Sequence, residues 1–219
     1  MTDLGKRRLP QLAVGLVLYG VSIALMVEAA LGLNPWDTFH QGVSQVTGLS
    51  IGVVVLVTGI PLLLLWIPLR QRPGIGTIAN VIVVGPAADL ALAVLNPGET
   101  LPARIAYLVG GVLLNAVATA MYLGADLGPG PRDGLMTGLV GRFPRLSVRV
   151  VRTGIEILVL AVGFLLGGTA GIGTILYAVT IGPLVQVFLP LFAIRPAPAP
   201  DPVGAGGNAH RSAGEGEMS

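Results

Sequence analysis

The sequence predicts an all-α membrane protein of six transmembrane helices, arranged as an inverted repeat of three plus three. Three observations predict this fold. The chain of 219 residues is 53% hydrophobic and only 11% charged, whereas about 25% of the residues in a soluble domain carry a charge. It contains several apolar runs of about 20 residues, the length that crosses a bilayer as a helix. A set of short motifs also occurs twice along the chain.

Each apolar run is interpreted as one helical span. The runs are continuous rather than alternating in polarity, and this pattern argues against a transmembrane barrel. The runs cover residues 11–31, 49–69, 75–95, 105–125, 150–167 and 172–194. They make up a single polytopic membrane domain over residues 1–195. Residues 196–219 are rich in Pro, Gly and Ala without an apolar period, and predict a disordered cytoplasmic tail.

The placement of positive charge predicts the orientation. If the amino terminus is cytoplasmic, six spans put every basic residue except Arg104 on the cytoplasmic side. Cytoplasmic loops of membrane proteins carry an excess of Lys and Arg. We therefore expect a bacterial inner-membrane protein with both termini in the cytoplasm.

The repeat is marked by motifs about 96 residues apart. Gly32, Pro35 and Asp37 recur as Gly128, Pro131 and Asp133, and GIGT at residues 74–77 recurs at 171–174. The two copies cover about residues 9–98 and 104–195. Each holds three spans, so the second copy enters the membrane from the opposite side, as in many secondary transporters whose site lies between the copies.

The first recurring motif predicts a helix start after the first span of each copy. Asn34 suits the N-cap, Pro35 the first helical residue and Asp37 the third. The sequence leaves open whether this short helix is interfacial or re-entrant. It also leaves open whether Asp37 and Asp133 only cap their helices or bind a ligand or proton. Arg132 adjoins Asp133 and should favour its ionised form, which leaves Asp37 better placed to exchange a proton.

The third and sixth spans each contain a Gly-Pro pair near the middle, at Gly85–Pro86 and Gly182–Pro183. Proline removes a helical hydrogen-bond donor and clashes with the preceding turn, so a kink or break is expected at each. Two breaks at equivalent positions point to a central binding site. Proline kinks that only shape the packing are the alternative.

Polar side chains within the spans are candidate binding or coupling groups, because a charge in the middle of a membrane helix is costly and its default interpretation is functional. Asp89 has no partner within its helix, and Arg104 could pair with it across the outer loop. The other candidates are Gln186, which is the repeat equivalent of Asp89, Asn115 and Glu156.

Glu156 lies one helical turn after Arg152, so an ion pair within the helix is its plainer interpretation. The cytoplasmic basic stripe of Arg145, Arg149 and Arg152 shares one helical face with it. The stripe could line a vestibule for anions, or it could contact lipid phosphates and fix the topology.

Several classes of protein are not supported. The chain has no cysteine, so disulfides, thiolate zinc sites and iron–sulfur clusters are excluded. It shows no cluster of metal ligands, no cofactor motif and no nucleophile with a base. We expect no cofactor, no metal, no nucleic-acid partner and no enzymatic activity.

The motifs LGLNPWDTFHQGVSQVTGLSIG, WIPLRQRPGIGT, LGPGPRDGLMTGL and VRTGIE, followed by GIGT with IGPLV, resemble the bacterial YczE/YyaS/YitT family of integral membrane proteins, and the YczE branch most closely. The resemblance covers nearly all of the chain except the tail. It implies a transporter-like membrane protein and supplies no substrate or catalytic residue.

Together these observations predict a bilayer-embedded protein that moves a small solute through a site between the two copies. The alternative is a membrane scaffold or regulator that docks a partner through its Arg-rich cytoplasmic loop. Homo-oligomerisation is left open.

Overall fold

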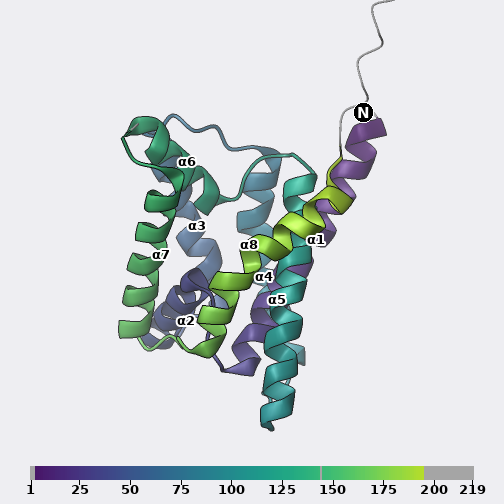
Figure 1. Ribbon diagram of the computed structural model, residues 1–219, viewed down its shortest axis with the longest axis vertical. Helices are drawn as coiled ribbons and strands as arrows, with labels where there is room; N and C mark the ends of the chain where they lie inside the picture. The colour runs from purple at the N-terminus through teal and green to yellow at the C-terminus, as the bar shows by residue number, and fades with distance from the viewer. Residues whose placement is uncertain (1–2, 144, 195–219) are drawn as a thin grey trace, which may run out of the picture.

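The computed structural model describes residues 3–143 and 145–194, and within them every regular element is an α-helix (Figure 1). The all-α class is therefore confirmed for the described residues. The predicted tail at 196–219 lies outside them. The helices are α1 (Asp3–Ala29), α2 (Pro35–Thr47), α3 (Ile51–Trp66), α4 (Ile75–Val94), α5 (Leu101–Gly124), α6 (Pro131–Arg142), α7 (Val148–Leu165) and α8 (Ile172–Phe192).

Four of these helices, α1, α4, α5 and α8, are long and apolar enough to cross a membrane. The bent pair of α2 and α3, which meet at 111°, could form a fifth span. The expected second span is the short helix α3, of 16 residues. The expected fifth span is α7, whose first half carries Arg149, Arg152 and Glu156. The structure thus supports four or five spans by length and composition, and six spans remain a prediction.

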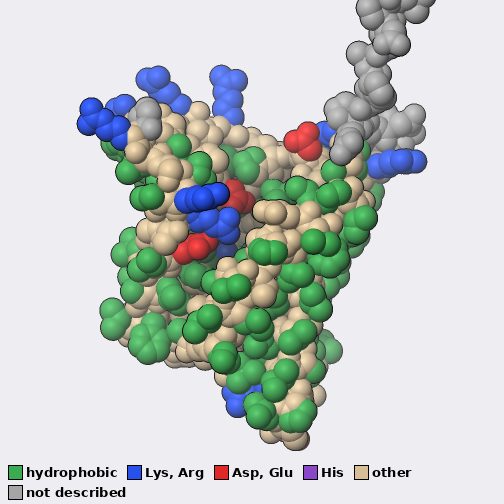
Figure 2. All heavy atoms as spheres, in the orientation of Figure 1, with side chains coloured by type: hydrophobic (Ala, Val, Ile, Leu, Met, Phe, Trp, Pro, Cys, Tyr) green, Lys and Arg blue, Asp and Glu red, His purple; other side chains and the backbone are tan. Residues whose placement is uncertain are grey.

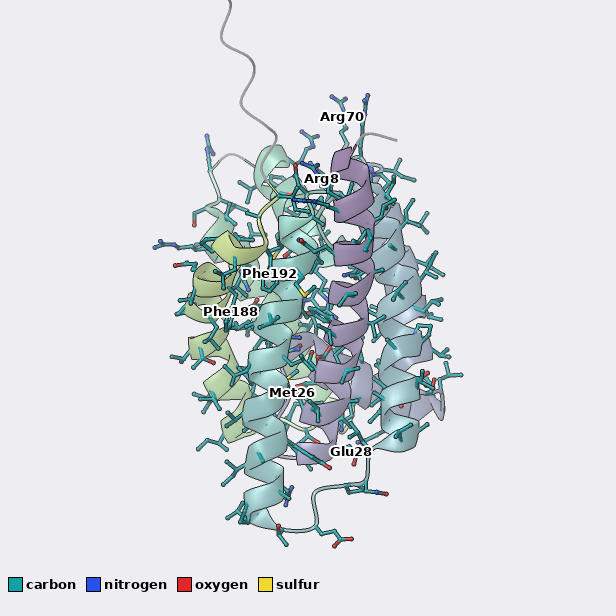
Figure 3. The ribbon with its side chains drawn as sticks, turned by 90° about the vertical axis from the view of Figure 1, so that its right-hand side faces the viewer. Arg8, Met26, Glu28, Arg70, Phe188 and Phe192 are labelled. Atoms are coloured by element: carbon teal, nitrogen blue, oxygen red, sulfur yellow. The ribbon has the colours of Figure 1, made fainter. Side chains whose placement is uncertain are left out.

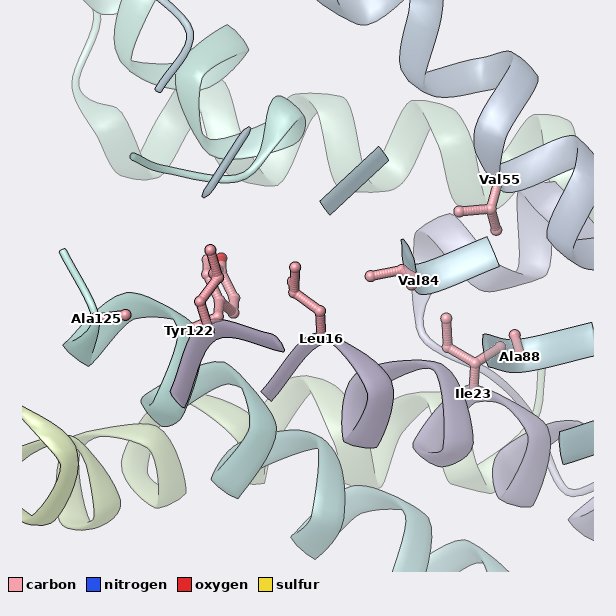
Figure 4. Close-up of a cluster of buried hydrophobic side chains, with 8 residues drawn as sticks. Leu16, Ile23, Val55, Val84, Ala88, Tyr122 and Ala125 are labelled. Atoms are coloured by element: carbon pink, nitrogen blue, oxygen red, sulfur yellow. The ribbon is translucent and has the colours of Figure 1, made fainter. Parts of the chain in front are cut away.

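The centre of the fold is the pair α1 and α5, with α4 packed on α1 and α8 packed on α5. Leu16 and Ile23 of α1 pack with Val84 and Ala88 of α4 in a buried cluster (Figure 4). Small residues bring these helices close together: a Cβ on Gly20 would overlap the α4 backbone, and one on Gly111 would overlap Met26. Close approach at small residues is how helices associate in a bilayer.

Two arginines at helix starts bind backbone carbonyl oxygens at the ends of other helices. Arg8 at the start of α1 donates to the carbonyl oxygens of Asp126 and Ile194. Arg104, its repeat equivalent at the start of α5, donates to the carbonyl oxygens of Ala29 and Ala30. The start of α1 and the end of α8 therefore lie at one end of the molecule. Figure 3 shows Arg8 and Arg70 at that end and Glu28 at the other.

The loops after α1 and α5 follow the same backbone path. Gly32 and Gly128 have φ angles of +117° and +120°. Residues with a side chain rarely adopt such angles. Gly173 N donates to Leu31 O at 2.8 Å, and Gly76 N donates to Leu127 O at 2.8 Å. The first GIGT motif thus binds the loop of the second copy, and the second GIGT motif binds the loop of the first.

A kink or break is expected at each Gly-Pro pair, and in the structure neither helix is broken there. Pro86 lies inside the continuous helix α4, and Pro183 lies inside the continuous helix α8. A helix can pass through a proline because only one hydrogen bond is lost and a bend accommodates the ring. α8 changes direction part-way along its length (Figure 1).

The helix pairs α3–α4 and α7–α8 occupy equivalent positions in the repeat but are arranged differently. α3 packs along α4, whereas α7 and α8 do not pack side by side. A methyl group added to Gly52 or Gly85 would overlap the other residue's carbonyl, whereas Gly182, the equivalent of Gly85, faces open space. The second copy is therefore open where the first is closed.

Candidate functional site: a charged cavity where two helix starts meet

A cavity of about 360 Å³ lies at the centre of the protein, and residues from all eight helices line it. The first turns of α2 and α6 both reach it, together with the middle parts of α4 and α8 and the last two turns of α5. Figure 2 shows a hollow beside α7 and α8 in which basic and acidic side chains are visible. The volume is in the range of pockets that bind small molecules.

The start of α2 is fixed by its own side chains. Asn34 is the N-cap, and its Oδ1 accepts a hydrogen bond from Asp37 N at 2.9 Å. Asn34 Nδ2 in turn donates to the Asp37 carboxylate. Leu33 N donates to Thr169 O, which attaches this start to the loop before α8. Asn34 therefore caps α2 as expected, and the Asp37 carboxylate holds the Asn34 side chain in place.

The start of α6 is held by other helices instead. Its N-cap is Gly130, which has no side chain to accept a backbone hydrogen bond. Trp66 Nε1 of α3 donates to Pro131 O at 3.0 Å, and Thr77 Oγ1 of α4 donates to Pro129 O at 2.7 Å. Tyr122 of α5 donates its hydroxyl hydrogen to Asp133 Oδ2 at 2.8 Å. This start is therefore positioned by α3, α4 and α5.

The two helix starts contact each other through repeat-equivalent residues. The Arg132 guanidinium of α6 lies 4.9 Å from the centre of the Trp36 ring of α2, within the range of a cation–π interaction. Arg132 Nη2 is also 3.6 Å from Asp37 Oδ1. Arg132, expected to act on Asp133, therefore also lies beside Asp37. That Asp37 exchanges a proton stays a prediction.

Asp37 is 1% exposed and its Oδ1 atom has unused hydrogen-bonding capacity. His40 Nδ1, one turn further along α2, is 3.5 Å from the same oxygen. Trp36 Nε1 also has no hydrogen-bond partner among the residues that the structure describes. Burying such groups without partners costs free energy. Of the two residues, Trp36 lines the cavity, whereas Asp37 lies behind it and faces Arg132 and His40.

α7 contributes one ion pair to the cavity. Arg152 Nε and Glu156 Oε1 are 2.9 Å apart, and both residues line it. The ion pair within the helix that the sequence suggested for Glu156 is therefore present. Arg145 and Arg149 are exposed and lie outside the lining. The basic stripe therefore does not line the cavity as a unit.

Aromatic residues form much of the remaining wall. Tyr19 of α1 and Tyr122 of α5 meet edge to face, with ring centres 6.4 Å apart. Tyr177 of α8 donates to Asn115 Oδ1 at 2.9 Å, and Asn115 Nδ2 donates to Ser22 Oγ at 2.8 Å. Asn115 is fully buried, so it supports the wall from behind and joins α1, α5 and α8.

The predicted site residues fall into three groups. Those that line the cavity are Asp133, Glu156, Gln186, Gly182 and Arg152. Those buried directly behind it are Asp37 and Asn115. Those outside the lining are Asp89, Gly85, Pro86, Pro183, Arg145 and Arg149.

Asp89 has partners that the sequence did not suggest. Its carboxylate accepts hydrogen bonds from Ser50 Oγ and from Gly52 N at 2.7 Å, so it caps the start of α3 from α4. Arg104, expected as its partner, instead binds carbonyl oxygens at the end of α1. A carboxylate at a helix start is stabilised by the helix dipole, which accounts for an acid within an apolar segment.

Sequence reasoning did not select Trp36, Arg132 and the three tyrosines as site residues. The signal for the first two was present, because they are the second residues of the two repeated helix starts. The tyrosines had no such signal, because a tyrosine in an apolar span most often packs in the core. Among residues 3–143 and 145–194, no group of three or more His, Asp or Glu side chains is placed to hold a metal ion.

The comparisons with known proteins agree on one family. Residues 6–190 match the family described as "Family of unknown function (DUF6198)". An "Uncharacterized protein" of Haemophilus influenzae is 40% identical over 185 residues, which are 84% of each chain. The "Uncharacterized membrane protein YczE" of Bacillus subtilis is 34% identical over 179 residues, 80% of this chain and 82% of its own. The "Uncharacterized protein YyaS" of the same species is 28% identical over 182 residues, 81% of this chain and 90% of its own.

No solved structure matches the chain. The resemblance to YczE and YyaS is confirmed by these identities. The apolar helices and the relative named as a membrane protein both indicate a membrane location. The family match covers most of the described helices, from α1 to the last turn of α8. The chain therefore belongs to the DUF6198 family, a family of unknown function.

Proposed function

We propose that this protein moves a small solute across the bacterial inner membrane through the central cavity, by alternating access between two inverted copies. The copies are residues 9–98 and 104–195, each with three spans, and both termini are cytoplasmic. The exchanged hydrogen bonds of the two GIGT motifs support this repeat, and so do the matching contacts of Arg8 and Arg104. Inverted repeats with a site between them are typical of secondary transporters.

The observation that carries the proposal is the difference between α3–α4 and α7–α8. In the first copy, Asp89 caps α3 and Gly52 lies against Gly85, so this side of the cavity is closed. In the second copy, Gly182 meets no neighbour and Gln186 lines the cavity. If the copies exchange these arrangements, the cavity closes between α7 and α8 and opens between α3 and α4. Such an exchange gives alternate access to the two sides of the membrane.

The candidate residues take different roles in this proposal. Asp133, Arg132 and the Arg152–Glu156 pair present charge to the solute. Asp37 holds Arg132, and Asn115 holds Tyr177. Gln186 and Gly182 lie on the movable wall, and Asp89 secures the closed pair of helices.

The test is uptake by proteoliposomes of a panel of labelled amines, amino acids, carboxylates and sugars. Gly182→Trp should abolish any uptake, because the indole would fill the cavity that Gly182 faces. Gly110→Trp is the matched control: this glycine also meets no neighbour but lies outside the lining. Uptake that Gly182→Trp leaves unchanged would show that the solute does not pass through this cavity.

A scaffold or regulator is the second candidate function. It is favoured by the exposed Arg142, Arg145 and Arg149 around the loop between α6 and α7, at one end of the molecule. A scaffold needs no passage through the cavity. It predicts that Gly182→Trp is harmless and that replacing these three arginines removes the biological effect.

A further inference from the structure

The charges around the cavity do not balance. Two arginines, Arg132 and Arg152, face three carboxylates, those of Asp37, Asp133 and Glu156. Arg152 is paired with Glu156 at 2.9 Å and Arg132 lies 3.6 Å from Asp37. Each cation therefore already has a carboxylate, and one negative charge is left over.

The remaining carboxylate is that of Asp133. Its Oδ2 accepts a hydrogen bond from the Tyr122 hydroxyl, and within the described residues it forms no ion pair. Asp133 is only part-buried and lines the cavity. A carboxylate in a site of low dielectric favours a cationic partner strongly. The same charge repels an anion.

The two helix starts do not reverse this preference. A helix N-terminus carries a partial positive charge that would attract an anion. Here each start has a carboxylate as its third residue, Asp37 in α2 and Asp133 in α6. The partial positive charges are therefore opposed within the protein itself.

Aromatic faces add to the attraction for a cation. Trp36, Tyr19, Tyr122 and Tyr177 all line the cavity. Trp36 already binds one cation, the guanidinium of Arg132, at 4.9 Å. Aromatic rings combined with a carboxylate are a recurring way to bind ammonium and guanidinium groups.

From these contacts we propose that the solute bound in the cavity is a small organic cation, a primary amine or a guanidinium compound, whose charged group binds Asp133. Its apolar part lies against Tyr19 and Tyr122. The inference rests on the proposed function only in taking the bound cation to be the transported solute. The binding itself is measured without transport. It assigns Asp133 as the residue that determines which charge is accepted.

The test measures the melting temperature of the full chain in lipid nanodiscs with three probes of equal length: n-butylammonium, butyrate and n-butanol. Anything that binds the folded state alone raises the melting temperature with concentration. We expect a saturable rise with n-butylammonium and none with the other two. Asp133→Asn should weaken n-butylammonium binding about tenfold or more, the usual loss when a charged hydrogen-bond partner is removed. Glu99→Gln, which removes a carboxylate in the exposed loop before α5, is the matched control and should bind as the unaltered protein does.

Three results would overturn the inference: an equal rise with butyrate or n-butanol, no rise with n-butylammonium, or full binding by Asp133→Asn. The comparison of the three probes uses the unaltered protein and so does not depend on the variant folding. Cation binding can fail while solute uptake through the cavity persists. In that case the cation class is wrong and the proposed function stands.

Discussion

The buried acids show most clearly what a residue's surroundings add to its position in the sequence. Asp89 looked isolated because its partners lie on another helix, at Ser50 and Gly52. Asp37 looked free of cations because Arg132 is 95 residues away in the chain. Helix position and spacing identified both residues as unusual. They could not supply partners that only the packing of helices brings near.

Asp89→Ala should therefore destabilise the protein without changing the cavity. Removing the carboxylate leaves Gly52 N without its acceptor, at a cost of about 1–3 kcal/mol. The melting temperature in nanodiscs should fall, and n-butylammonium binding should be unchanged. A variant that melts normally but has lost binding would return Asp89 to the list of ligand-binding residues.

Asp37→Asn and Asp133→Asn should differ in stability. Loss of the Asp37 charge leaves Arg132, whose side chain is 22% exposed, without its carboxylate, at a cost of about 2 kcal/mol. Loss of the Asp133 charge weakens a single hydrogen bond from Tyr122, at about 1 kcal/mol. Chemical unfolding of the two variants in the same lipid gives both values. Equal losses would mean that the contact between Arg132 and Asp37 carries no net stability.

Among the helices, α2 and α6, the short helices after the first span of each copy, were the least predictable. Neither their depth nor their neighbours could be predicted, because their apolar stripes suit an interfacial and a re-entrant position equally. In the structure their first turns line one cavity and meet through Trp36 and Arg132. α4 and α8 are more regular than predicted, because both run through their prolines without a break.

The proposed movement of α7 against α8 predicts a specific cross-link. Ser147 and Gln186 are the repeat equivalents of Ser50 and Asp89, which are in contact. Because the chain has no cysteine, Ser147→Cys with Gln186→Cys introduces the only two thiols. We expect an oxidant to join them in membranes, and the cross-linked protein to take up no solute.

The pair Ser50→Cys with Asp89→Cys is the control for this experiment, because these residues already lie together in the structure. It should cross-link readily. If the control pair forms its disulfide and the Ser147–Gln186 pair never does, α7 does not close on α8 and the proposed exchange is wrong.

For the whole molecule, the sequence predicted the all-helical class, the family and the recurrence of the motifs. The recurring Leu-Gly loops were visible as motifs because glycine is needed at Gly32 and Gly128, where φ is strongly positive. The count of spans was less certain from composition, because α3 and α7 are short or charged. The first copy has Gly52 and Asp89 where the second has Arg149 and Gln186. These differences did not predict which side of the cavity is closed, because that depends on how the helices pack.

The central claim is that one cavity is reached in turn from both sides of the membrane. Thr119→Cys tests it most directly, because Thr119 lines the cavity from α5 and the chain has no other thiol. Thr47→Cys at the end of α2 and Arg142→Cys at the end of α6 are the controls, exposed toward the outside and the cytoplasm in the proposed orientation.

The measurement is labelling by a membrane-impermeant maleimide, in intact cells and in inside-out vesicles. We predict that Thr119→Cys reacts in both preparations, Thr47→Cys only in cells and Arg142→Cys only in inside-out vesicles. Reaction of Thr119→Cys from one side alone, while both controls behave as expected, would contradict alternating access.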